Sequence, residues 1–236
     1  MSRLIVTVDL DWASEAAIEE TLAFLKAKKV DTTVFITHRS PAVEACMNEL
    51  DVALHPFFGP DSSHGNSISE VVHYVMNLPH NFPAFRCHRF GVCNASRQAM
   101  VEAGMLLSSN VCTDLEIVPP FRDRFGLLEV PIFLEDGGYL WRKRPLEMNP
   151  DLLTPLLGKG DKVLLIHPMH FSLNTPHFEY MSQLKKSFSR KEWNQMTDAT
   201  LNRFRWKKRG IRDLLEEVLQ VTPQFCSLKS LLGGVI

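Results

Sequence analysis

Short runs of hydrophobic residues recur through the first 170 positions of the chain, and polar stretches with helical spacing separate them. The run at 4–8 is continuous and rich in β-branched residues, which is typical of a parallel strand buried on both faces. Similar runs lie at 32–37, 51–54, 84–87, 105–108, 127–134 and 163–166. Each has the length of an ordinary strand, so the pattern predicts about seven strands in this part of the chain.

Helix-start signals occupy the stretches between these runs. Ser14 and Ser40 stand where helices should begin, and Pro41 suits the first position of the second helix. Ser67 and Glu70 have the spacing of a capping box. Strands that alternate with helices pair in parallel through right-handed crossovers. The pattern therefore predicts an α/β fold, an incomplete or distorted (β/α)7 barrel that forms a single domain over residues 1–236.

The character of the chain changes after about residue 174. Ten Lys or Arg residues lie between Lys185 and Arg212, against only Glu192 and Asp198. Four aromatic residues are interleaved with them, so we interpret 175–212 as a basic, aromatic-rich insertion within the barrel. Such a charge excess could attract a lipid diphosphate, a nucleotide or the headgroups of an anionic membrane. A solvated helical face with a few anchoring aromatic side chains is the alternative.

Composition narrows the function classes. Hydrophobic residues make up 45% and charged residues 22%, as in an ordinary globular protein. The net charge of −1 argues against a general nucleic-acid binder. The five cysteines are odd in number and form no CxxC pair, so we expect free thiols, a reducing compartment and hence a cytoplasmic protein. The first residues lack the apolar core of a signal peptide, and no run of about 18 apolar residues predicts a membrane span.

Side chains capable of chemistry follow the hydrophobic runs repeatedly. In an α/β barrel the carboxyl ends of all strands open onto one face, and that face carries the active site. Separate segments should therefore bring carboxylates, imidazoles and a guanidinium to the same rim. The residues concerned are Asp9, Asp11, His55, Arg86, His88, Glu135, Asp136 and His167.

The first two of these segments suggest a metal site. Asp11, His55 and His64 together offer one carboxylate and two imidazoles, a set that suits Zn²⁺ or another divalent ion with a position left for water. His64 lies in a loop rich in Gly and Pro that could fold back; a solvated loop histidine is the alternative. Asp9 and Asp11 would share one side of a regular strand and repel each other unless a cation separates them. They could instead cap the following helix.

The last strand ends in a histidine that could act as an acid. A carboxylate near His167 would keep the imidazole protonated, as a general acid requires. His170, three residues later, is more simply interpreted as structural. Amide hydrolysis needs both an activated water and an acid for the leaving amine, and a bound Zn²⁺ lowers the pKa of water to about 7 while polarising the carbonyl.

Five short motifs occur in a characteristic order. They are Thr7-Val-Asp9-Leu-Asp11-Trp12, His55 with His64, Phe85-Arg86-Cys87-His88, Glu135-Asp136, and Leu164-Leu-Ile-His167. In this order they resemble the motifs of the NodB-homology polysaccharide deacetylases, carbohydrate esterase family 4. The resemblance covers about residues 3–170 and a terminal segment at 225–228, and is closest to the WbmS-like proteins of O-antigen gene clusters.

The resemblance implies a metal-dependent amide hydrolase. Asp11, His55 and His64 would bind the metal, Zn²⁺ or another divalent ion. The chain departs from the family pattern in three places. Eight residues separate the two histidines, His88 stands where a proline is usual, and the tryptophan expected after the fourth motif is absent unless Trp141 supplies it.

The same resemblance implies roles for the remaining motifs. Asp9 would be the general base, and Arg86 would keep it ionised and oriented. His167 would protonate the leaving amine, and Asp136 would support either Arg86 or His167. The reaction implied is removal of an acetyl group from an N-acetylated sugar. Hydrolysis of a formamide or a cyclic amide stays open, because connecting loops rather than rim motifs determine the substrate.

The expected substrate of a cytoplasmic enzyme of this kind is an acetamido sugar on a nucleotide or lipid diphosphate, or a growing O-antigen-like glycan. Two other classes stay open. A deacetylase-like barrel could recognise a glycan without hydrolysing it, or a cysteine hydrolase could use Cys87 or Cys93 with His88. Loss of amidase activity with a chelator, but not with iodoacetamide, would separate these hypotheses.

Overall fold

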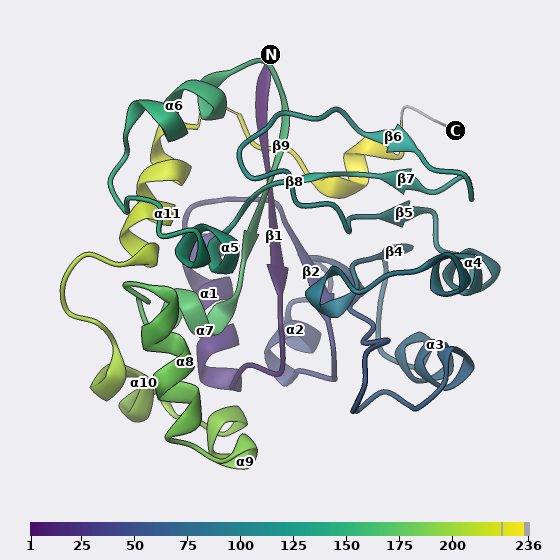
Figure 1. Cartoon of the computed structure of the whole chain (residues 1–236), viewed down its shortest axis with the longest axis horizontal. Coiled ribbons are helices and arrows are strands. Elements are labelled where there is room, and N and C mark those ends of the chain that lie inside the picture. Colours follow the sequence, from purple (N-terminus) through teal and green to yellow (C-terminus); the bar gives the residue numbers. More distant parts are fainter. Residues whose placement is uncertain (223, 234–236) are drawn as a thin grey trace.

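The computed structural model describes residues 1–222 and 224–233 and has a single curled sheet at its centre (Figure 1). The strands stand in the order β6-β7-β5-β4-β3-β2-β1-β9-β8, and every neighbouring pair is parallel except β6 with β7. The strands are β1 (Ser2–Asp9), β2 (Thr32–Ile36), β3 (Asp51–Leu54), β4 (Ala84–Phe85), β5 (Leu107–Ser108), β6 (Phe121–Arg122), β7 (Leu128–Glu129), β8 (Ile132–Glu135) and β9 (Gly160–Ile166). The predicted α/β architecture is confirmed.

The sheet curls because one stretch of chain pairs at two places in it. β7 and β8 are separated only by Val130 and Pro131, yet β7 pairs with β5 and β8 pairs with β9. Proline lacks the N–H that a ladder needs, which explains why the strand predicted at 127–134 is split here. A bridge between Cys112 and Ile132 ties the segment after β5 to β8. The parallel strands β1 to β5, β8 and β9 thus form the predicted incomplete (β/α)7 barrel.

Alternate residues of β1 face opposite sides of the sheet, which determines where a polar site can form. Leu4 and Val6 pack in the layer between the sheet and the helices, whereas Ile5 packs inside the barrel. Thr7 and Asp9 follow Ile5 on the same face and are buried as well. The interior is therefore apolar near the amino end of β1 and polar near its carboxyl end.

Helices cover the outside of the barrel, and α1 packs against α7. The helices are α1 (Glu15–Ala27), α2 (Pro41–Ala45), α3 (Ile68–Met76), α4 (Asn94–Glu102), α5 (Asp136–Trp141), α6 (Pro150–Leu157), α7 (Pro168–Ser172), α8 (Phe178–Lys186), α9 (Arg190–Asn194), α10 (Asp198–Phe204) and α11 (Ile211–Val221). Ser14, Ser40 and Ser67 cap α1, α2 and α3 as predicted, and Ser67 forms the capping box with Glu70. None of the helices in the described part of the chain is long and apolar enough to cross a membrane.

The chain after β9 covers both ends of the barrel. α8, α9 and α10 follow the last strand and lie toward the end of the molecule to which β1 points (Figure 1). The last described segment returns to the opposite end, where Phe225 bridges to Leu4 and the N–H of Cys226 donates to the Leu4 carbonyl at 3.1 Å. Leu228, in the 3₁₀ turn η2 (Leu228–Leu231), is fully buried in the interior core beside Ile5.

Candidate active site

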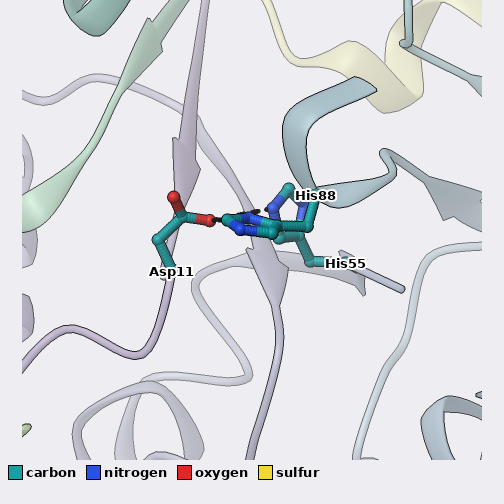
Figure 2. Close-up of side chains that lie close together, drawn as sticks. All are labelled: Asp11, His55 and His88. Carbon is teal, nitrogen blue, oxygen red and sulfur yellow. Dashed lines mark hydrogen bonds and ion pairs between the residues drawn. The ribbon is translucent and has the colours of Figure 1, made fainter. Parts of the chain in front are cut away.

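Three polar side chains meet beyond the carboxyl ends of nearby strands (Figure 2). Asp11 lies in the turn after β1, His55 directly after β3, and His88 at the start of the 3₁₀ turn η1 (His88–Phe90) in the connection after β4. Nε2 of His55 and Nδ1 of His88 lie 3.0 and 2.8 Å from the same oxygen, Oδ1 of Asp11. One ligand atom from each residue lies within 4.8 Å of the other two. The parallel sheet thus brings together residues that are up to 77 positions apart.

The cluster of Asp11, His55 and His88 suits a divalent metal ion in both donor atoms and spacing. Two imidazoles and a carboxylate are typical Zn²⁺ ligands, and the ligand atoms of a tetrahedral zinc site lie about 3.3 Å apart. The spacings around Oδ1 of Asp11 are close to this value. Burial would raise the pKa of Asp11, but hydrogen bonds from His55 and His88 hold it well below its ordinary value. The carboxylate is therefore ionised and able to bind a cation.

The backbone around this cluster adopts the left-handed conformation at four residues that are not glycine. Asp11 and Trp12 have φ angles of 47° and 53°, and Arg89 and Phe90 have φ angles of 57° and 54°. Each such residue costs on the order of 1 kcal/mol or more, and such costs concentrate at functional sites. Both turns lie next to the cluster, one after β1 and the other after β4.

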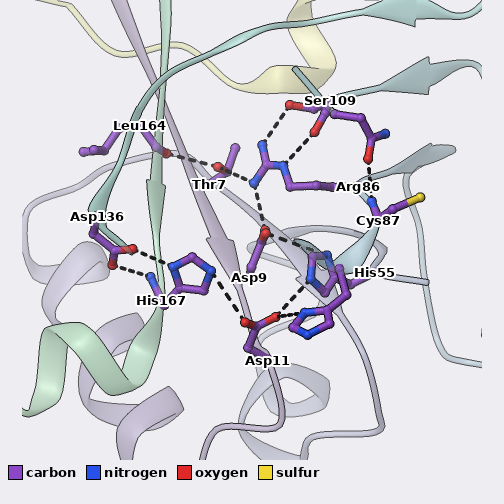
Figure 3. Close-up of polar contacts among 12 residues, drawn as sticks. Thr7, Asp9, Asp11, His55, Arg86, Cys87, Ser109, Asp136, Leu164 and His167 are labelled. Atoms are coloured by element: carbon purple, nitrogen blue, oxygen red, sulfur yellow. Dashed lines mark hydrogen bonds and ion pairs between the residues drawn. The ribbon is translucent and has the colours of Figure 1, made fainter. Parts of the chain in front are cut away.

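Arg86 is a fully buried cation at the polar end of the barrel interior (Figure 3). Its Nη1 donates to Oδ1 of Asp9 at 2.8 Å and to Oγ1 of Thr7 at 2.9 Å. Its Nε and Nη2 donate to the carbonyl and hydroxyl oxygens of Ser109. The other carboxylate oxygen of Asp9, Oδ2, faces Nδ1 of His55 at 3.7 Å. Arg86 thus holds one carboxylate oxygen of Asp9 while the other faces His55.

A second polar network supports the strand end that carries Arg86 and His88. The N–H of Cys87, between them, donates to Oδ1 of Asn110 at 2.7 Å. The N–H of Asn110 donates in turn to the buried carboxylate of Glu129 at 2.5 Å. Asn110 and Glu129 lie outside every motif in the sequence, and no local pattern marked them, because their partners come from other strands.

His167 faces the cluster from the end of β9 (Figure 3). Its Nδ1 and its backbone N–H contact the carboxylate of Asp136 at 2.5 and 2.7 Å, and its Nε2 lies 3.7 Å from Oδ2 of Asp11. Burial alone would lower the pKa of His167, but Asp136 and then Asp11 outweigh it and raise the pKa to about 10. Of the two partners considered for Asp136, Arg86 and His167, the structure pairs it with His167.

His64 lies apart from this cluster, although it was predicted as the second histidine ligand. Its Nδ1 accepts a hydrogen bond from the N–H of Phe57 at 3.1 Å, and its ring stacks on Tyr74 at 4.6 Å. Burial lowers the pKa of His64 to about 4, so the ring is neutral. Its Nε2 is buried without a hydrogen-bond partner among the described residues, but it is not one of the ligand atoms that converge on Asp11. The second histidine beside Asp11, together with His55, is His88.

The loop after β4 also decides the cysteine-hydrolase hypothesis. His88 stands where a proline is usual in the family, and its position two residues after Arg86, at a strand end, predicted that it lies at the rim. Burial raises the pKa of the Cys87 thiol far above its ordinary value. Cys93 is exposed and makes no hydrogen bond to His88 in the part of the chain that the structure describes. Neither thiol forms the thiolate–imidazole pair that such an enzyme needs.

Two clefts open beside the cluster. The first, of about 500 Å³, is lined by Glu135, His167 and Trp141 among others, and we call it the His167 cleft. The second, of about 470 Å³, is lined by Trp12 and Arg190 among others, and we call it the Arg190 cleft. Both volumes are in the range of small-molecule sites. The residues that line both clefts are Asp11, His88, Arg89, Lys185 and Trp193.

A sequence profile described as WbmS-like polysaccharide deacetylase matches residues 6–185. The chain belongs to this family. The match spans the barrel from the middle of β1 to beyond β9 and includes the site residues from Asp9 to His167. The WbmS-like protein described here is accordingly a hydrolase that acts on a carbon–nitrogen amide bond. No curated protein matches the chain significantly.

Two solved structures show the same fold. The crystal structure of a polysaccharide deacetylase assigned to O-antigen biosynthesis in Bordetella bronchiseptica has a TM-score of 0.82 at 21% identity, over 94% of this chain and 91% of that one. A structure assigned as a polysaccharide deacetylase from Mycobacterium smegmatis has a TM-score of 0.56 at 14% identity, over 99% of this chain and 90% of that one. At such identities these matches establish the barrel rather than the substrate.

Proposed function

We propose that the chain is a metal-dependent deacetylase that hydrolyses the N-acetyl amide of a sugar, with Asp11, His55 and His88 as its metal ligands. The proposal rests on the convergence of two imidazoles and an ionised carboxylate beside a buried Asp–Arg pair and a buried Asp–His pair. Zn²⁺ suits this donor set best, with other divalent ions as alternatives. When bound, the ion would polarise the amide carbonyl and lower the pKa of a water molecule.

Asp9 and His167 would carry out the proton transfers. Arg86 occupies Oδ1 of Asp9, so Oδ2 is the atom that would take a proton from the attacking water. Asp136 holds Nδ1 of His167, so Nε2 is the atom that would give a proton to the leaving amine. Asp136 also accepts from the backbone N–H of His167, which fixes the direction of the ring toward the cluster.

The substrate that we propose is an acetamido sugar of an O-antigen-like glycan or of its precursor on a nucleotide or lipid diphosphate. The assignment of the Bordetella relative to O-antigen biosynthesis supports this choice. The five cysteines, all unpaired, support a reducing compartment and hence a cytoplasmic location. The interpretation of 175–212 as an insertion within the barrel stays a prediction. So does contact between the basic stretch at 185–212 and an anionic membrane.

Metal content, measured by inductively coupled plasma mass spectrometry, tests the proposal first. We expect about one equivalent of zinc or another divalent ion in the wild type and little in His55→Ala, because the variant lacks one of its ligands. Metal-loaded enzyme should release acetate from N-acetylated oligosaccharides, and a chelator should abolish the release. A wild type that holds no metal even after incubation with Zn²⁺ would refute the proposal.

The same preparation separates the alternative activities. Release of formate, or ring opening of a cyclic amide, in place of acetate release would identify a deformylase or a cyclic amide hydrolase on the same barrel. A metal-loaded protein that binds glycan but hydrolyses no amide would be a glycan-binding domain. Inhibition by iodoacetamide, with no effect of a chelator, would revive the cysteine-hydrolase hypothesis.

A further inference from the structure

The cations of the 185–212 segment fall into two groups in the structure. Arg205 and Arg212 both bind Glu20, and Arg209 binds a carboxylate of α11, at 2.5 to 2.7 Å. These arginines attach the segment to the barrel. Substitution of Arg205 and Arg209 would therefore test packing rather than the binding of a phosphate or a membrane.

Three other cations converge on the clefts beside the cluster. Lys185 at the end of α8 and Arg89 in the loop after β4 line both clefts, and Arg190 at the start of α9 lines the Arg190 cleft. All three are exposed. None of them forms an ion pair with a carboxylate within residues 1–222 and 224–233. They come from segments about 100 positions apart in sequence, so only the fold brings them together.

Two of these cations lie beside aromatic rings. The Lys185 ammonium lies 5.4 Å from the ring centre of the buried Trp193. The Arg190 guanidinium lies 5.6 Å from the ring centre of Trp12, which directly follows Asp11. Cation–π contacts of this kind hold a charge without neutralising it. The charges thus remain available to a ligand in the cleft.

The carboxylates free to neutralise these three cations are fewer than the cations themselves. Asp11 belongs to the metal cluster, and Glu135 lines the His167 cleft but not the Arg190 cleft. Asp61 is the remaining carboxylate among the described residues that line the Arg190 cleft. Three cations around one uncommitted carboxylate produce a positive potential, which attracts anions.

We propose that Arg89, Lys185 and Arg190 form an anion subsite, so that the sugar to be deacetylated is linked to a phosphate or carboxylate group. The inference rests on the proposed function, because it places the acetamido group at the cluster and the negatively charged neighbour in the Arg190 cleft. Two guanidinium groups and an ammonium can together bind either kind of oxyanion. The substrate class is then a sugar phosphate or an acidic glycan.

Ligand-observed NMR titrations of the full-length protein test the subsite without requiring turnover. The probes are N-acetylglucosamine 1-phosphate, a disaccharide of glucuronate and N-acetylglucosamine, and the neutral methyl glycoside of N-acetylglucosamine. At low salt we expect a charged probe to bind about tenfold more tightly than the neutral one, and this preference should shrink as salt is added. A preference for the sugar phosphate alone would identify phosphate as the anion. A preference for the glucuronate disaccharide alone would identify carboxylate.

A matched pair of variants assigns the preference to residues. Arg89→Gln/Lys185→Gln/Arg190→Gln should lose it, whereas Lys186→Gln/Lys191→Gln should keep it, because these neighbouring exposed lysines do not line the clefts. Equal binding of charged and neutral probes, or equal losses in both variants, would overturn the proposal. The proposal would also be overturned if the protein showed no preference for the charged probes and the three cations were needed only for binding to vesicles of anionic lipid.

The test of the anion subsite can fail or succeed independently of the test of the proposed function. The subsite requires the three cations and not the metal, so the preference should persist in His55→Ala and after treatment with a chelator. Failure of the metal-content test with the preference intact would refute the deacetylase proposal alone. A metal-containing, active enzyme with no preference would refute the subsite alone.

Discussion

His55 lies between two carboxylates, with Nε2 3.0 Å from Asp11 and Nδ1 3.7 Å from Asp9. A histidine that binds a metal commonly directs its other ring nitrogen to a carboxylate, which sets its tautomer and its orientation. Nδ1 of His55 is buried and has no hydrogen bond within the described residues, so Asp9 is the group placed to fill that role. Asp9 would then both orient the metal ligand His55 and take a proton from the attacking water.

The identity of the third ligand can be tested at this scale. His88→Ala should weaken zinc binding by about 100-fold or more, because even residues that only orient ligands contribute about 10- to 100-fold. His64→Ala should leave zinc affinity within about threefold, because its ring stacks on Tyr74 away from the cluster. Competition with a chromophoric chelator measures both. The opposite ranking would restore the predicted role of His64.

Arg86 provides a prediction about stability. Arg86→Met leaves the buried Asp9 without its cation, which should lower the free energy of unfolding by about 3–5 kcal/mol. Urea denaturation measures the change, and activity should fall with it. The control is Arg39→Met, which removes an exposed arginine from a surface pair with Glu44 and should change stability little. An equal effect of the two substitutions on stability would contradict the role of Arg86 as the cation that neutralises buried Asp9.

Among the secondary-structure elements, α10 and α11 are attached to α1 through a shared carboxylate. Glu20 of α1 accepts hydrogen bonds from Arg205, directly after α10, and from Arg212 of α11. Arg205 also donates to the carbonyl of Ser172 at 2.7 Å. These partly buried contacts position the segment that carries α8 and α9, and with it one wall of both clefts.

Glu20→Gln tests this attachment. The substitution removes the charge shared by Arg205 and Arg212, so we expect a loss of about 1–2 kcal/mol in the free energy of unfolding. Glu19→Gln, one position earlier on the same helix and exposed, should have little effect. Thermal and urea unfolding compare the two variants. Equal stability of both would mean that packing alone holds α10 and α11 in place.

Across the whole molecule, the two ends of the barrel have separate tasks. The carboxyl ends of the strands carry the polar cluster, and the amino end of β1 is covered by the segment around Phe225 and Leu228. Ile5 and Leu228 belong to the apolar interior core, while Arg86 and Asp9 occupy the polar end above it. A barrel can therefore lose stability at one end without losing its site at the other.

Leu228→Ala tests this separation. It removes a fully buried side chain from the interior core and should lower stability by about 2–4 kcal/mol. Metal content of the folded protein should stay at the wild-type level, because the substitution lies at the opposite end from the cluster. Leu157→Ala, at a half-exposed leucine, is the control and should cost much less. Loss of metal from folded Leu228→Ala would show that the two ends are coupled.

The sequence by itself determined the barrel and most of its rim. Hydrophobic runs of strand length, separated by capped helices, leave a parallel α/β barrel as the consistent arrangement. The seven barrel strands overlap the predicted runs, whereas β6 lies outside all of them. A residue that directly follows a parallel strand must lie at the carboxyl rim, which is why Asp11, His55, Arg86 and His167 could be placed from their positions alone. The contact between Arg86 and Asp9 was implied by the family resemblance and not by this rule.

Only the tertiary structure decided which rim residues meet. His88 rather than His64 joins Asp11. The N–H of His88 donates to the carbonyl of Pro56, next to His55, while the His64 ring accepts from a backbone N–H and stacks on Tyr74. The ten cations of 185–212 looked alike in sequence, yet some bind carboxylates of the same chain and others face the clefts. Periodicity reports which face of an element a residue occupies. Which partner it meets depends on loop conformation and on contacts between distant segments, and these exist only once the chain has folded.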